Sequence, residues 1–344
     1  INRFQGRSSF YTWAFRIAVN LTLNRCRRNV RLPVTSLEAP ASQGQEDKKQ
    51  LLKDFLSDDS SPDPAAGSRA APPERGARAA SASAIAYGRT ADQLTQLDLP
   101  AVHDSGCVGT GVLICVLAEG FNVHDTHEAL RDVAIAPGHR RDFVEGDTIV
   151  TDLFQPLAFG HGSQVLAILA GKKPGAYVGA AFGADYALRR TEAHASEHRI
   201  EMVYWGMGAE WADSLGADII SSSLGYTTFD PPDASYAYAD MNGHTTIISR
   251  AAEIAASKGI LVVNSVGNEG STLWRRLVAP ADVSGDSLIA VGAVDASGVV
   301  AGFSSRGPSA DGRIKPDLVA RGKDSPLISP AGGPVAYETG SGTS

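Results

Sequence analysis

The chain has 344 residues, which is enough for one large domain with an attachment or for two domains. Its net charge of −7 argues against nucleic-acid binding by the chain as a whole, and no apolar run approaches the ~18 residues of a membrane span. Three scattered cysteines predict neither a disulfide framework nor a metal site, so we expect no metal and no other cofactor.

The first segment is predicted to be a basic helix over residues 8–29. Phe10, Ala14, Ile17 and Leu21 recur at helical spacing. Residues 1–32 contain seven arginines and no acidic residue, so the rest of the chain is distinctly acidic. Arginines interleaved with aromatic residues are suited to phosphate contacts and to stacking on unpaired bases, although an amphipathic core helix with a solvated basic end shares this pattern.

A linker is predicted next. Up to residue 84 the chain is rich in proline, small and charged residues, which cannot bury enough apolar surface to offset the entropy lost on ordering. We therefore divide the chain into a basic helical fragment at 1–37, a disordered linker at 38–89 and a folded domain at 90–344.

From about residue 95 the pattern predicts alternating strands and helices. Strand-like apolar runs lie at 111–117, 218–221 and 259–264, and helices are expected at 164–170 and 245–257. Buried strands separated by helices indicate an α/β domain with a mostly parallel sheet flanked by helices.

Three polar residues in this domain suit serine proteolysis, which requires a nucleophile, a base that activates it and donors for the oxyanion. His161 opens a predicted helix in a His-Gly-Ser motif, Asn268 follows an apolar strand in Val-Gly-Asn-Glu-Gly, and Ser344 ends Gly-Ser-Gly-Thr-Ser. Taken singly, each also fits an ordinary helix start, turn or loop. Their order along the chain favours the catalytic interpretation.

These motifs resemble those of subtilisin-like serine peptidases over about residues 90–344. Residues 303–308 and 314–318 also match segments upstream of that family's nucleophile. The resemblance implies that His161 is the general base, Ser344 the nucleophile and Asn268 the oxyanion donor. It also implies that a peptide or protein substrate pairs along its backbone with three further residues, Ser223, Leu224 and Gly225.

Two departures from the family pattern predict an inactive or strongly impaired enzyme. Ala118 stands where the resemblance implies the aspartate of the triad, and Glu119 is one residue late, so strand alternation turns it away from His161. The sequence also stops at Ser344, so we expect a truncated domain that lacks the following core helix and is only marginally stable.

Residues 1–32 resemble part of an extracytoplasmic-function sigma factor, in the pattern Phe-x-Gly-x-Ser, Thr-Trp and Arg-Ile-Ala-x-Asn followed by a basic tail. This implies possible contact with DNA or RNA polymerase. Two alternatives to an active peptidase therefore stay open: a DNA-binding transcription regulator and a peptide-binding pseudoprotease. The compartment also stays open, because such peptidases are usually secreted or in the cell envelope whereas sigma factors act in the cytoplasm.

Overall fold

The computed structural model describes residues 85–151, 160–283 and 288–344. The predicted helix at 8–29, the sigma-like fragment at 1–37 and the linker up to residue 84 lie outside the described residues. Packing begins before the expected boundary at residue 90. Tyr87 is buried against Leu94 and Val178, and Gly88 pairs with Tyr177.

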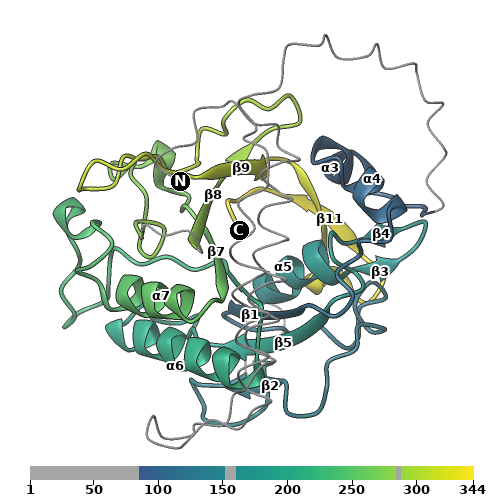
Figure 1. Cartoon of the computed structure of the whole chain (residues 1–344), viewed down its shortest axis with the longest axis horizontal. Helices are drawn as coiled ribbons and strands as arrows, with labels where there is room; N and C mark the ends of the chain where they lie inside the picture. Colours follow the sequence, from purple (N-terminus) through teal and green to yellow (C-terminus); the bar gives the residue numbers. More distant parts are fainter. Residues whose placement is uncertain (1–84, 152–159, 284–287) are drawn as a thin grey trace, which may run out of the picture. The chain divides into compact units, whose positions relative to one another are not determined.

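A seven-stranded parallel sheet forms the centre of the domain, in the order β2-β5-β1-β6-β7-β8-β9 (Figure 1). Most strand positions are buried, as expected when helices cover both faces of a parallel sheet. The architecture confirms the predicted α/β fold. The strands are β1 (Leu113–Ala118), β2 (Arg140–Asp142), β5 (Asp185–Arg190), β6 (Ile219–Ser222), β7 (Leu261–Ser265), β8 (Leu288–Val294) and β9 (Leu318–Arg321).

The two faces of the sheet pack against different helices. Cys115 and Leu117 of β1 belong to a buried cluster with α6 and α7, whereas Val116 and Ala118 belong to a second cluster with α5. Successive strand residues point to opposite faces, so this alternation fixes which helix each contacts. The helices are α3 (Ala91–Gln96), α4 (Leu99–Asp104), α5 (His161–Ala170), α6 (Arg199–Leu215) and α7 (Ile247–Ser257).

Short elements complete the described part of the chain. Two antiparallel hairpins flank the sheet, and the turn of the second brings Pro330 against the start of α5. None of the described helices is long and apolar enough to cross a membrane. The short elements are β3 (Lys172–Lys173), β4 (Tyr177–Val178), β10 (Ser325–Ile328), β11 (Tyr337–Gly340), η1 (Tyr238–Asp240), η2 (Glu269–Ser271) and η3 (Pro330–Gly332).

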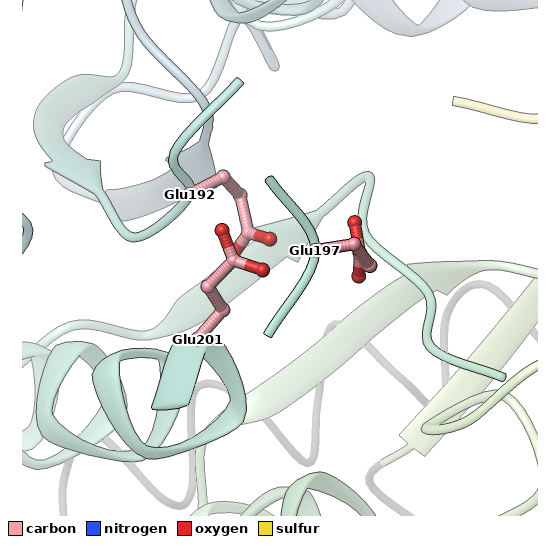
Figure 2. A group of neighbouring side chains, drawn as sticks. All are labelled: Glu192, Glu197 and Glu201. Atoms are coloured by element: carbon pink, nitrogen blue, oxygen red, sulfur yellow. The ribbon is translucent and has the colours of Figure 1, made fainter. Parts of the chain in front are cut away.

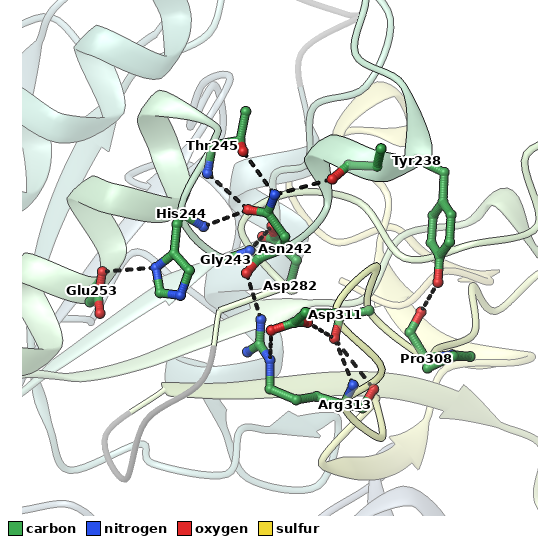
Figure 3. Close-up of polar contacts among 12 residues, drawn as sticks. Tyr238, Asn242, Gly243, His244, Thr245, Glu253, Asp282, Pro308, Asp311 and Arg313 are labelled. Atoms are coloured by element: carbon green, nitrogen blue, oxygen red, sulfur yellow. Dashed lines mark hydrogen bonds and ion pairs between the residues drawn. The ribbon is translucent and has the colours of Figure 1, made fainter.

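A polar network anchors the start of α7 (Figure 3). The fully buried Asp282 accepts hydrogen bonds from the backbone N–H of Gly243 and the hydroxyl of Ser249. Arg313 donates to the carbonyl of Asn242 from a third segment. Because buried polar groups must be paired, this network holds α7 in position over the sheet.

Candidate active site

The sequence-predicted site residues lie where parallel strands end at their carboxyl edge, the usual place for a site in an α/β sheet. Ala118 is the last residue of β1, residues 223–225 follow β6, and Asn268 follows β7. His161 is the first residue of α5, three residues earlier than the expected start of this helix at 164.

Helix α5 starts in close contact with the end of β1. A Cβ atom placed on Gly162 would lie 2.2 Å from the carbonyl oxygen of Gly120 and 2.9 Å from Cβ of Ala118. Only glycine fits this approach. Ala118 therefore lies beside the helical turn that carries His161.

The environment of His161 favours its neutral form. Burial lowers the pKa of the imidazole, and the nearby charge of Glu119 opposes this shift without reversing it. A neutral imidazole is the state that a general base needs at neutral pH.

Glu119 lies close to His161 in the described part of the chain but does not hydrogen-bond to it. Its Oε2 lies 3.3 Å from Nδ1 of His194, and among the described residues no hydrogen bond joins it to His161. Both side chains nevertheless line one cavity, and the carboxylate acts on the ring through its charge. Glu119 is thus near the histidine without orienting it.

The structure brings Asn268 together with the residues around Ser344. Oδ1 of Asn268 accepts hydrogen bonds from the backbone N–H of Thr343 at 2.9 Å and from its hydroxyl at 3.1 Å. The Thr343 hydroxyl also accepts from the N–H of Gly267. Ser344 is exposed, and no hydrogen bond between it and His161 is found in the described part of the chain.

The segment at Ser223, Leu224 and Gly225 borders a cavity of about 270 Å³ that also contains His161. The carbonyl of Leu224 accepts a hydrogen bond from Nδ2 of Asn264, which fixes the segment to β7. A Cβ at position 225 would lie 2.2 Å from Cγ2 of Val278, so the chain passes too close there for a side chain.

The sequence analysis missed a group of three carboxylates, two of which, Glu192 and Glu197, line this cavity. One carboxylate oxygen each of Glu192, Glu197 and Glu201 lies within 4.8 Å of the others, close enough to hold a cation (Figure 2). Figure 2 shows the groups of Glu192 and Glu201 pointing toward one another, from the loop after β5 and from the first turn of α6. None of the three had a clear sequence signal, because the N-cap residue three positions before Glu201 is His198 and not one of the usual capping residues.

Known proteins with sequences similar to this chain include subtilisin-like proteases. The chain is 31% identical over 221 residues to subtilisin-like protease SBT6.1 of Arabidopsis thaliana, which covers 60% of this chain and 19% of that protein. It is 28% identical over 234 residues to subtilisin E of Bacillus subtilis (strain 168), which covers 67% of this chain and 52% of that protein. The chain thus spans about half or less of the length of these two relatives.

Two solved structures share the fold. The prenylagaramide maturation protease PagA matches with a TM-score of 0.51 and 23% identity, over 71% of this chain and 74% of that one. MycP1 with its N-terminal propeptide removed matches with a TM-score of 0.51 and 21% identity, over 73% and 78%. The model of the Subtilase family matches residues 109–344. With more than half of its length matched, the chain belongs to the subtilase family of serine peptidases.

Proposed function

We propose that this domain cleaves peptide bonds by a serine mechanism at a strongly reduced rate. In this proposal Ser344 attacks the carbonyl of the substrate, His161 accepts the proton of the serine hydroxyl, and Asn268 donates a hydrogen bond to the oxyanion. The rate is low because no carboxylate at position 118 orients the histidine.

The orientation of Asn268 carries the proposal. The N–H of Thr343 can only donate, so the side-chain atom facing it is the oxygen of the Asn268 amide. The Nδ2 group has no hydrogen-bond partner among the described residues, and Asn268 is an exposed residue. This free donor lies beside Thr343, the residue before Ser344, so it is suited to stabilising an oxyanion formed at that serine.

A fluorophosphonate probe tests the proposal, because it reacts with a serine only when that serine is activated. We expect slow labelling of Ser344, located by mass spectrometry of the peptide that carries it. Ser344→Ala and His161→Ala should each abolish labelling. Absence of labelling both in the unchanged protein and in the Ala118→Asp variant would remove the proposed function.

A second candidate is peptide binding without cleavage. The observation that favours it is Ala118 itself, because loss of the orienting carboxylate removes turnover and leaves the segment at residues 223–225 intact. A labelled peptide that binds but is never cleaved, together with an unlabelled Ser344, would favour this candidate over the first.

We also propose that residues 1–32 contact nucleic acid. Seven arginines without an acidic residue support this separate role. Binding of the protein to single-stranded DNA should weaken steeply as salt is raised, and a variant lacking residues 1–32 should lose it. Binding that is independent of salt would contradict this role.

A further inference from the structure

We propose that the cavity beside residues 223–225 binds a cationic side chain of the peptide, preferably arginine, and that Glu192 and Glu197 determine this specificity. The inference rests on the proposed peptide-binding function and adds a substrate class to it. It follows from the charge of the cavity, from unpaired carboxylate oxygens in its wall and from its place beside the peptide-binding segment.

The cavity has a volume of about 270 Å³ and a strongly acidic wall. Three carboxylates line it, from Glu119, Glu192 and Glu197, together with His161 and with His194, whose Nδ1 lies 3.3 Å from Oε2 of Glu119. No lysine or arginine is among the lining residues. The space is large enough for one side chain, and the wall offers acceptors for a cation.

Glu192 directs an unpaired oxygen to this space. The side chain is 8% exposed, and its Oε1 accepts hydrogen bonds from the hydroxyls of Thr191 and Tyr226. Its Oε2 accepts no hydrogen bond from the described residues, and this atom is not completely buried. This oxygen therefore faces the cavity. The two hydroxyl groups fix its direction.

The carboxylates of Glu197 and Glu201 differ in their hydrogen bonding. Both oxygens of Glu201 accept backbone N–H groups, from Ala193 and His198, so this carboxylate serves the start of α6. The carboxylate of Glu197 makes no hydrogen bond within the described residues. Glu192 and Glu197 therefore each have at least one oxygen without a hydrogen bond, whereas both oxygens of Glu201 already accept one within the described residues.

Such a group of carboxylates is costly unless a positive charge joins it, because burial and mutual repulsion both disfavour the ionised forms. The neighbouring Arg199 does not supply this positive charge. Arg199 donates to the carbonyl of Ala234 and stacks over the rings of Phe229 and Tyr236. Without a ligand these groups hold protons more readily, since burial raises the pKa of both Glu192 and Glu197, and a bound cation would favour their ionised forms.

A guanidinium group is better suited than a metal ion to bring a positive charge to these carboxylates. Its planar fork of N–H donors reaches two carboxylates at once, so it can contact Glu192 and Glu197 together. Calcium takes six to eight oxygen ligands, and within this group only Glu192 and Glu197 offer a carboxylate oxygen that makes no other hydrogen bond.

The position of the cavity points to a peptide as the source of this group. Residues 223–225 continue β6 and are the expected partners of an extended substrate backbone. An extended peptide paired with such a segment turns alternate side chains toward the surface below it. One of these side chains would enter the acidic cavity beside His161.

Equilibrium binding of fluorescent hexapeptides tests the inference. Each peptide carries a single arginine at one of the six positions in a glycine–alanine background, and its control carries neutral citrulline there. Fluorescence anisotropy with the Ser344→Ala protein gives Kd without cleavage. At one position arginine should bind at least about tenfold more tightly than citrulline, as expected for charge-assisted hydrogen bonds.

Isosteric variants identify the carboxylates responsible. The double substitution Glu192→Gln and Glu197→Gln should abolish the preference for arginine, and Glu210→Gln on the exposed side of α6 should preserve it. A preference that survives the double substitution would overturn the assignment. So would calcium binding, measured by calorimetry, that the same substitutions remove. If the double variant does not fold, the comparison of arginine with citrulline peptides on the otherwise unchanged protein still decides whether a cationic side chain is preferred.

The outcomes separate this inference from the function on which it rests. Equal binding of arginine and citrulline peptides at every position would overturn the cationic subsite and leave peptide binding intact. Failure of every peptide to bind would remove the peptide-binding function itself, and the subsite with it.

Discussion

The backbone N–H of Thr343 donates to Oδ1 of Asn268 at 2.9 Å. This hydrogen bond joins the residue before the candidate nucleophile to the candidate oxyanion donor. It turns the amide so that its NH₂ group is available to a substrate. Two segments that are 75 residues apart in sequence thereby form one site.

Substitutions at Asn268 should separate the two uses of this side chain. Asn268→Ala should slow fluorophosphonate labelling of Ser344 by about 10²- to 10³-fold, the usual effect of losing an oxyanion donor. Asn268→Asp keeps the acceptor for Thr343 but removes the donor, so it should slow labelling at least as much. Labelling at the normal rate in Asn268→Asp would show that the side chain only positions Thr343.

Ala118→Asp should raise the rate of peptide cleavage. Ala118 lies against the first turn of α5, so a carboxylate at this position would be next to His161. Loss of the orienting aspartate lowers kcat in a subtilisin by about four orders of magnitude, and its return should recover much of that factor. Casein hydrolysis by the variant, beside a doubly substituted Ala118→Asp, Ser344→Ala protein, measures the gain.

Glu119→Asp is the matched control for that experiment. It also places an aspartate at the end of β1, but on a side chain directed to His194. We expect no gain in activity. Equal gains in the two variants would show that the orientation assigned to the strand end is wrong.

Gly162→Ala should destabilise the domain, since the added methyl group would overlap the carbonyl of Gly120. Overpacking of this kind costs about 1–3 kcal/mol of unfolding free energy. Gly302→Ala is the control, because a Cβ there meets nothing within 4 Å. Urea denaturation of the two variants measures the difference, and similar losses in both would contradict the close approach of α5 to β1.

The parallel sheet could be predicted because its central strands are nearly continuous apolar runs. The strands expected at 111–117, 218–221 and 259–264 correspond to β1, β6 and β7, each shifted by one or two residues at its ends. Such shifts are normal, because hydrogen bonding rather than hydrophobicity sets the last residue of a strand.

Helix α6 was not predicted, although its sequence carries a signal. Met202, Trp205, Ala209 and Ala212 are buried at spacings of three and four residues, which is the pattern of an amphipathic helix. The acidic cavity had no comparable signal. Glu192 lies on a loop, and only the three-dimensional path of that loop brings its carboxylate to Glu197 and residues 223–225.

The raised pKa of Glu197 predicts how stability changes with pH. Burial, followed by repulsion from Glu201 and Asp230, raises the pKa of Glu197 from 4.5 to about 7. Below pH 4.5 the group is protonated in both the folded and the unfolded chain. Between pH 4.5 and 7 the folded chain retains a proton that the unfolded chain releases, so this group makes the protein less stable as the pH rises. Above pH 7 the destabilisation is complete.

Glu197→Gln removes the titrating group and should therefore raise the unfolding free energy at pH 8, with little difference from the unchanged protein at pH 4. Chemical denaturation at both pH values measures the two differences. Glu210→Gln, at an exposed position of α6, should change neither value appreciably. A stabilisation by Glu197→Gln that is as large at pH 4 as at pH 8 would mean that the effect is not due to ionisation.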